Sequence, residues 1–261
     1  MGDARGGDAI IRVEDLSAGY GERLLFERVS FAVKRGEVFV ILGGSGSGKS
    51  TLLKHMIGLY RPAAGHVWID GADIASAEGA ERLAILRKIG VMYQAGALFG
   101  SMTLLENVRL PMEEFTELPD EAMDAIAASK LKLVQLEGFE RFYPAEISGG
   151  MAKRAAIARA MALDPAILFL DEPSAGLDPI TSAELDQTIL RLARTLAVTF
   201  VVVTHELPSI FTIADRVIML DQRARGIIAS GSPAQLRDHP TSDFVRRFFR
   251  READAAPAAP A

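Results

Sequence analysis

Nine consecutive residues near the start of the chain have the types and spacing that bind phosphate. They fit the pattern G-x-x-x-x-G-K-[ST] and lie between a short apolar run and a stretch with apolar residues at helical spacing. Glycine lets the backbone approach a phosphate without a Cβ in the way, and the N–H groups of the loop and of the next helix attract the anion. The alternative is a flexible Gly/Ser turn. The predicted phosphate-binding residues are Gly43, Gly44, Ser45, Gly46, Ser47, Gly48, Lys49, Ser50 and Thr51.

Two side chains of this stretch have specific chemical roles in such a loop. Lys49 reaches the β- and γ-phosphates of a nucleotide and so serves catalysis as well as binding. The hydroxyl of Ser50 is a ligand for Mg²⁺. The stretch therefore predicts a site at which a phosphate chain and a magnesium ion are held together.

Two adjacent carboxylates end an unbroken apolar run at 166–170. Such a run indicates a buried parallel strand, and ligands bind at the carboxyl ends of the strands in open α/β sheets. Asp171 suits Mg²⁺, directly or through water, and Glu172 suits the orientation or deprotonation of an attacking water. An ordinary polar strand end is the alternative, and the phosphate loop in the same chain argues against it.

Three isolated residues gain meaning from their places near predicted strand ends and turns. Gln94 follows the strand at 89–93, and a glutamine there is usually only solvated. His205 follows the strand at 198–203, where it is either structural or close enough to contact a γ-phosphate. Tyr20 lies between two glycines upstream of the phosphate loop, where it is either a turn residue or a ring that stacks on adenine.

A second anion-binding helix start is predicted at Ser148, Gly149 and Gly150. Ser148 is a good N-cap for the Ala-rich helix at 152–163, and the two glycines leave N–H groups open toward an anion. The tripeptide alone is a weak signal, because many turns contain it.

The remaining pattern predicts the elements that position these residues. Residues 95–150 form a mainly helical insertion punctuated by Pro111, Pro119 and Pro144. The predicted strands are 9–13, 26–33, 38–42, 65–70, 89–93, 166–170, 198–203 and, as the last one, 217–220. The predicted helices are 51–57, 78–88, 103–108, 120–134, 152–163, 180–196 and 207–214.

Composition narrows the function classes. The chain has 261 residues with 49% hydrophobic content, a net charge of −5 and no cysteine. The charge provides no overall field for nucleic acid, and disulfides and cysteine metal sites are excluded. No apolar run approaches the ~20 residues that span a bilayer, and the N-terminal residues do not resemble a signal peptide. We expect a soluble protein unless a partner holds it at a membrane.

The order and spacing of these motifs over residues 9–235 resemble an ABC-type ATPase subunit. The resemblance implies an α/β fold: a P-loop ABC ATPase with a RecA-like parallel-sheet core, an N-terminal antiparallel β subdomain and a helical signature subdomain at about 95–160. It implies ATP and Mg²⁺ as cofactors, with Tyr20 stacking on adenine and Gln94 sensing the γ-phosphate and ligating Mg²⁺. It also implies a head-to-tail dimer in which Ser148 and Gly150 close over the ATP of the opposite subunit. Met151 departs from the usual Leu-Ser-Gly-Gly-Gln.

Three segments look like the ATPases of Mla-type phospholipid transport systems and their Mce-associated relatives. They are Gly-Ala-Leu-Phe-Gly-Ser-Met-Thr at 96–103, Gly-Gly-Met-Ala-Lys-Arg at 149–154 and Leu-Asp-Glu-Pro-Ser-Ala-Gly-Leu-Asp-Pro at 170–179. The resemblance implies an ATP-hydrolysing subunit that helps to move phospholipid between the inner and outer membranes. Its partners would be an inner-membrane permease, a periplasmic MCE-domain protein and a small STAS-domain protein. The chain would lie on the cytoplasmic side of the inner membrane, held by the permease and without contact to nucleic acid.

Three other functions remain open. The chain can serve a transporter for another solute, such as an amino acid, a metal complex or a drug. It can be a non-transport ABC ATPase acting on DNA or ribosomes, although it has one motif set and no heptad run. It can be an interaction module with a dead site, against which Lys49, Asp171, Glu172 and His205 all argue.

The two ends of the chain lie outside the ATPase pattern. We expect disorder at 1–8 and 252–261 and a helical extension at 236–251. Phe244, Val245, Phe248 and Phe249 form one helical stripe with arginines opposite. The stripe packs on its own domain, lies on a membrane surface or contacts a partner protein. The lipid-transport resemblance favours the partner, and we then expect the core not to need this helix.

Overall fold

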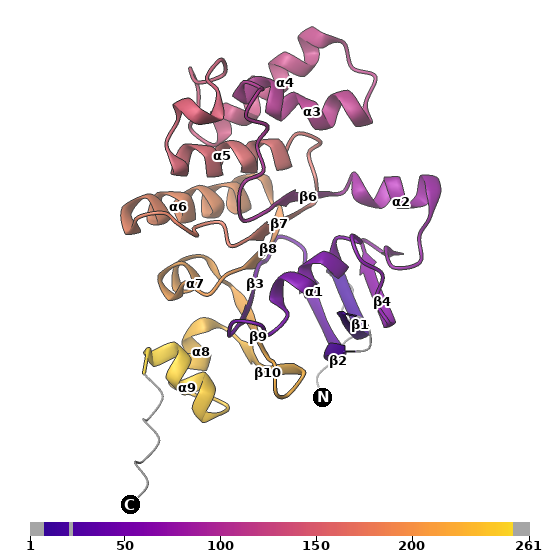
Figure 1. The fold of residues 1–261 in the computed structure, drawn as a ribbon, viewed down its shortest axis with the longest axis vertical. Coiled ribbons are helices and arrows are strands. Elements are labelled where there is room, and N and C mark those ends of the chain that lie inside the picture. Colours follow the sequence, from indigo (N-terminus) through magenta and orange to yellow (C-terminus); the bar gives the residue numbers. More distant parts are fainter. Residues whose placement is uncertain (1–7, 21–22, 253–261) are drawn as a thin grey trace, which may run out of the picture.

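The computed structural model describes residues 8–20 and 23–252, and its largest element is a six-stranded sheet (Figure 1). The strand order is β10-β9-β3-β8-β7-β6, with β10 antiparallel to β9 and all other neighbours parallel. A parallel sheet collects the carboxyl ends of its strands at one edge, where ligands bind. The strands are β3 (Val38–Gly43), β6 (Ile89–Met92), β7 (Ile167–Asp171), β8 (Thr199–Val203), β9 (Arg216–Asp221) and β10 (Gly226–Gly231).

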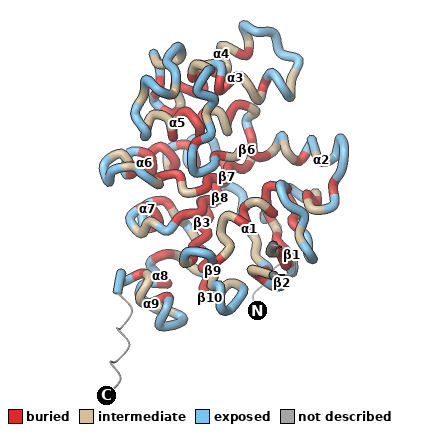
Figure 2. Tube along the Cα trace, in the orientation of Figure 1, coloured by how far each residue is buried: buried red, intermediate tan, exposed pale blue. Residues whose placement is uncertain are grey.

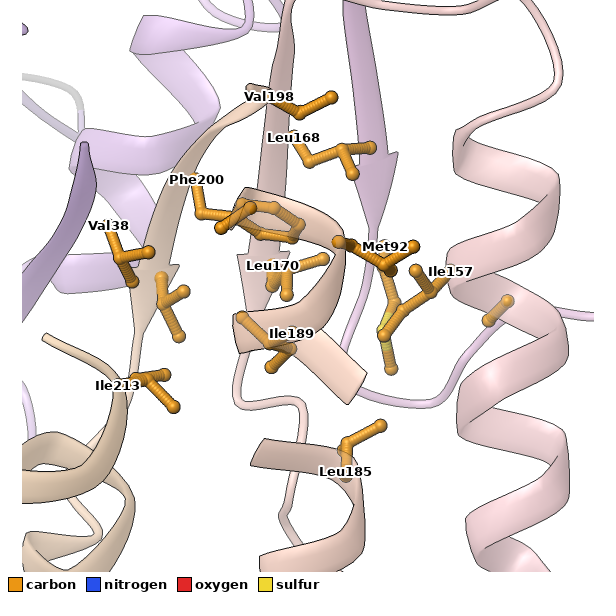
Figure 3. Close-up of a cluster of buried hydrophobic side chains, with 14 of the residues drawn as sticks. Val38, Met92, Ile157, Leu168, Leu170, Leu185, Ile189, Val198, Phe200 and Ile213 are labelled. Carbon is orange, nitrogen blue, oxygen red and sulfur yellow. The ribbon is translucent and has the colours of Figure 1, made fainter. Parts of the chain in front are cut away.

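The unbroken apolar runs of the central strands are explained by burial on both faces of this sheet. Along β3, Val38 and Val40 belong to one hydrophobic cluster, while Phe39 and Ile41 belong to the other. Successive strand residues point to opposite faces, so a strand covered on both sides is apolar at every position. Figure 2 shows the central strands buried, and Figure 3 shows Phe200 and its neighbours against side chains of the covering helices. These helices include α6 (Pro179–Leu196) and α7 (Leu207–Ile213).

A second, antiparallel sheet lies on the other side of helix α1 (Lys49–Met56). Leu52, Leu53 and Met56 of α1 are buried in the cluster that both sheets share. The helix that follows the phosphate loop is therefore held between two sheets. Helix α2 (Gly79–Leu86) precedes β6 and contributes Ile85 to the same cluster. The order of this sheet is β2-β1-β4-β5, formed by β1 (Ala9–Tyr20), β2 (Arg23–Lys34), β4 (Ala64–Ile69) and β5 (Ala72–Asp73).

The segment between β6 and β7 is helical, as its sequence predicted. Thr103 and Glu106 form a reciprocal capping box that starts the first helix. That helix continues through Pro111. The proline was expected to punctuate the segment, and it does not end the helix. It removes one backbone donor, and tertiary packing supports the rest of the helix. The elements are α3 (Leu104–Phe115), α4 (Asp120–Leu133), the short 3₁₀ helix η1 (Pro144–Glu146) and α5 (Gly149–Ala160).

The C-terminal part corrects the expected end of the sheet. The strand at 217–220 is not the last, because β10 follows and pairs with β9. β10 is an edge strand that buries only Ala229, so it carries little hydrophobic signal. Helices α8 (Pro233–Asp238) and α9 (Asp243–Arg250) then complete the described chain.

Helix α9 packs on its own domain. Val245 and Phe249 are buried in the main hydrophobic cluster, and the ring of Phe249 meets that of Phe211 edge to face at 5.9 Å. Phe248 is partly buried against the same cluster, and Phe244 is 36% exposed. Of the three alternatives for this stripe, the structure shows packing on its own domain, which removes the reason to expect that the core does not need the helix. Most of the terminal segments expected to be disordered, 1–7 and 253–261, lies outside the described residues.

Candidate functional site

The predicted strand, glycine loop and helix are all present around Lys49. β3 ends at Gly43, and α1 begins at Lys49. Gly43 has φ 156°, and a Cβ there would lie 2.3 Å from the Ser47 hydroxyl oxygen and 2.6 Å from the Leu220 carbonyl oxygen. Gly48 caps α1 with φ 92°, in the left-handed region that favours glycine. Both positions therefore require the residue that the phosphate-binding pattern specifies.

The loop forms a cradle over which the Lys49 side chain folds back. Its ammonium donates to the carbonyl oxygens of Gly43 and Gly44 at 2.9 and 3.1 Å. Burial lowers the pKa of Lys49, and the charges of Glu172 and Asp171 oppose that shift. A pocket of about 500 Å³ adjoins the loop, and it is lined by Leu25, Gly46, Gly48, Lys49, Ser50, Thr51 and Gln222.

One buried atom of the loop shows that the cradle fits a polar ligand. The hydroxyl of Ser47 is buried and has no hydrogen-bond partner within the described part of the chain. A buried hydroxyl in a globular protein normally has a partner. The unpaired hydroxyl, the tight glycine loop and the adjacent ammonium together suit the phosphates of a nucleotide.

The structure joins the predicted metal ligands Ser50 and Asp171, although 121 positions separate them in the chain. The Ser50 hydroxyl donates to one carboxylate oxygen of Asp171 at 3.2 Å. Burial raises the pKa of Asp171, the Ser50 hydrogen bond lowers it, and the neighbouring Glu172 raises it further. A hydroxyl and a carboxylate are the hard oxygen donors that Mg²⁺ prefers.

The predicted base and the predicted γ-phosphate contact touch each other. Nδ1 of His205 lies 2.9 and 3.0 Å from the two carboxylate oxygens of Glu172 and donates to them. Glu172 is a non-glycine residue at φ 47°, and its N–H donates to the carbonyl of Val203 at 2.8 Å. Strained backbone of this kind concentrates at functional sites. The ion pair holds the carboxylate at the sheet edge beside Asp171.

Gln94 lies in the loop after β6, and its side chain is exposed. The described residues show no hydrogen bond between this side chain and Ser50 or Asp171. Because β6 is parallel to β7, with Met92 opposite Leu170, this loop begins beside Asp171. Burial raises the pKa of Tyr93 most, and the charge of Asp171 adds to the shift. The loop therefore borders the site, and the role of the Gln94 side chain stays a prediction.

The Ser148 segment starts helix α5, as predicted. The Ser148 hydroxyl accepts a hydrogen bond from the N–H of Met151 at 3.2 Å. A Cβ on Gly150 would lie 2.2 Å from a methyl carbon of Thr181, at the beginning of α6. Within the part of the chain that the structure describes, no hydrogen bond links Ser148 to the phosphate loop. Met151, at the position of the usual glutamine, packs partly against the hydrophobic core.

One predicted site residue has no described side chain, and two contacts at the site were not predicted. Tyr20 ends β1, but its side chain is not among those that the structure describes, so its stacking on adenine stays a prediction. Gln222 borders the phosphate pocket from the turn between β9 and β10. Lys153 of α5 reaches the carbonyl of Gln94. Neither contact has a sequence signal, because both residues look like solvated polar positions.

The fold and this edge of the sheet define a P-loop nucleotide-binding protein. The family model described as ABC transporter matches residues 26–175. The chain belongs to this ABC transporter family, and it is an ATP-binding and ATP-hydrolysing subunit. The predicted α/β fold, with its parallel-sheet core, antiparallel sheet and helical subdomain, is confirmed.

Three similar proteins frame the comparison. The probable ribonucleotide transport ATP-binding protein mkl of Mycobacterium leprae is 43% identical over 92% of this chain and 68% of its own length. The intermembrane phospholipid transport system ATP-binding protein MlaF of Escherichia coli is 38% identical over 94% of this chain and 90% of its own length. A dimeric ATP-binding cassette solved in a post-hydrolysis state with ADP and Pi has a TM-score of 0.76 and 32% identity, over 85% of this chain and 98% of that one.

Proposed function

We propose that this chain powers the movement of phospholipid between inner and outer membranes. The observation that carries the proposal is the match to the E. coli phospholipid-transport protein, which covers 94% of this chain and 90% of that relative. The partners would be an inner-membrane permease, an MCE-domain protein and a small STAS-domain protein. The chain would lie on the cytoplasmic side of the inner membrane. No described helix is long and apolar enough to cross a bilayer.

An apolar groove supports contact with a permease. It has a volume of about 360 Å³ and lies where the segment after α1 meets α2, β6, α3 and α5. Leu59 is 53% exposed and Tyr93 36% exposed, and both line it. Exposed apolar surface next to a polar rim is typical of interaction sites. A permease segment seated here would touch the same loop that carries Gln94, so transport and hydrolysis would meet at one place.

The residues of the sheet edge have distinct chemical roles in the proposed hydrolysis. The loop amides and Lys49 hold the β- and γ-phosphates, and Tyr20 stacks on adenine. Ser50, Gln94 and Asp171 would hold Mg²⁺, which would neutralise phosphate charge. Glu172 accepts a proton from the attacking water, and His205 keeps that carboxylate oriented toward the phosphates.

A second copy of the chain would complete each site. Ser148 and Gly149 are exposed at the start of α5, where N–H groups are open toward an anion. In a head-to-tail dimer these residues and Gly150 would close over the ATP held by the other subunit. The dimeric state of a similar solved cassette supports this arrangement.

The transported molecule is tested by isolating the chain from membranes together with its partners. Mass spectrometry of the complex should find phospholipid, and the reconstituted complex should transfer labelled phospholipid between vesicles only with ATP. The variant Glu172→Gln serves as the control that binds ATP without transfer. The M. leprae relative favours a second candidate, ribonucleotide transport. ATP-driven ribonucleotide uptake without lipid transfer would support that candidate and overturn the lipid proposal.

A further inference from the structure

Two cations on helix α5 hold the backbone of the loop that follows β6. Lys153 is buried, and its ammonium donates to the carbonyl oxygen of Gln94. The guanidinium of Arg159 donates to the carbonyl oxygens of Gly96 and Ala97 at 2.9 and 2.7 Å. Three carbonyls within four consecutive residues are therefore bound by side chains of one helix. Lys153 and Arg159 are called the α5 cations below.

The loop has a conformation that needs such support. Gly96 and Ala97 are both in the left-handed region, with φ 71° and 51°. The N–H of Gly96 donates back to the carbonyl of Tyr93 at 2.7 Å, which closes a tight turn. A Cβ on Gly96 would lie 3.6 Å from the Ala156 side chain, so the turn presses directly against α5. A left-handed alanine is disfavoured in isolation, and the charge-assisted hydrogen bonds hold it in place.

The α5 cations also lie next to the two functional surfaces. Lys153 donates to the carbonyl of Gln94, and the charge of Glu172 opposes the lowering of its pKa by burial. Burial lowers the pKa of Arg159 as well, and this side chain lines the apolar groove. Helix α5 begins at Ser148–Gly150. One rigid helix therefore connects the Ser148 segment, the Gln94 loop and the groove.

We propose that Lys153 and Arg159 are positioning residues that hold the Gln94 loop on α5, so that Gln94, the Ser148 segment and the groove move as one unit. The proposal rests on the role of Gln94 proposed above. Its consequence is mechanical: displacement of the loop at the groove is passed to the start of α5 through these side chains. Without them the loop would move separately from the helix.

The contact itself is tested by hydrogen exchange in the nucleotide-free chain. Lys153→Met and Arg159→Met should each increase exchange of the amides at 93–98 by roughly 10-fold, because each removes charge-assisted hydrogen bonds from this backbone. Arg154→Met is the matched control. It also lies on α5, and its guanidinium donates to the carbonyl oxygen of Val134, at the end of α4, at 3.5 Å. Unchanged exchange in both loop variants would overturn the proposal.

The functional step is tested by combining variants. Lys153→Met should lower kcat about 10-fold and leave ATP binding without Mg²⁺ unchanged, while Lys153→Arg should recover most of the loss. Lys153→Met should cause no further loss in a Gln94→Ala background, because both changes remove the same positioned group. If the losses from Lys153→Met and Gln94→Ala multiply, the proposal that Lys153 positions Gln94 is overturned, and the proposed role of Gln94 is not affected. Full activity of Gln94→Ala itself would overturn the proposed role of Gln94 and the positioning claim with it.

Discussion

The phosphate loop and the Ser148 segment are both loops that start a helix, but they are completed differently. The phosphate loop meets its chemical partners inside the chain: Ser50 bonds to Asp171, and Glu172 bonds to His205. Ser148 is exposed, and its helix packs by Gly150 against Thr181 rather than against that loop. The described chain thus brings the residues of one proposed half-site together and leaves Ser148, of the other proposed half, exposed. Such an arrangement is what a shared site between two copies requires.

The largest expected effect concerns the phosphate loop and the residues that meet it within one chain, called the self-contained half below. Glu172→Gln keeps the shape of the side chain and removes its basicity, so phosphate release should fall by at least ~100-fold. ATP binding should persist, because Lys49 and the loop amides are untouched. Phosphate release and nucleotide affinity are measured on the same preparation. Turnover near the wild-type rate would contradict the proposal that Glu172 is the base of the self-contained half.

The next prediction tests whether the exposed Ser148 segment completes the site of the other copy. Ser148→Arg and Lys49→Ala homodimers should each be nearly inactive. In a mixed dimer one shared site carries both changes and the other carries neither, so part of the activity should return. Mixed dimers are purified with two different tags, and wild-type chains mixed in the same way are the control. No recovery in verified mixed dimers would place Ser148 outside the site of the other copy.

The sequence predicted the self-contained half because its signals are local. A buried strand, a glycine loop and a helix are contiguous, and steric demands at Gly43 and Gly48 allow no other residue type. The pairing of Glu172 with His205 spans 33 positions and depends on the neighbouring positions of β7 and β8 in the sheet. Each residue was predicted separately, and their contact follows only from the strand order.

Other features were missed because burial overrides the local pattern. No role was predicted for Lys153 from the sequence, yet it is buried against a carbonyl. The apolar stripe of α9 looked available to a partner, although Val245 and Phe249 fill the core below α7 and α8. Periodicity shows which residues share a face, and it does not show which surface covers that face.

A smaller effect is expected where the two halves are joined. Gly150→Ala places a Cβ 2.2 Å from the Thr181 methyl carbon, so α5 must shift against α6. We expect a loss of roughly 1–3 kcal/mol in stability from this overpacking, with a drop in ATP turnover. Gly149→Ala is the matched control, because its Cβ would lie at an ordinary 3.6 Å from Leu177. Chemical denaturation compares the two variants, and equal losses would mean that the contact with Thr181 does not set the position of Ser148.

A second substitution that removes the clash tests whether the contact with Thr181 causes the lost stability. Thr181→Ser removes the methyl group that a new Cβ would meet and keeps the hydroxyl. If Gly150→Ala acts through this clash, the double variant should regain most of the lost stability. A double variant that is no better than Gly150→Ala would assign the loss to the backbone instead.

The smallest predicted effect concerns Asp186, on the helix α6 that runs between the two halves. Burial raises the pKa of this carboxyl from its ordinary 3.8 to about 6; the Ser209 hydroxyl opposes the shift, and the charge of Glu206, next to His205, adds to it. Between these values the folded chain binds more protons than the unfolded chain, so the free energy of unfolding falls as pH rises through that window. Asp186→Asn should remove this slope and raise the free energy of unfolding near pH 7 by roughly 2 kcal/mol. Urea unfolding of both chains at about pH 4 and about pH 7 measures it, with Glu184→Gln, exposed on the same helix, as the control. An unchanged slope in Asp186→Asn would show that another group causes the pH dependence of stability.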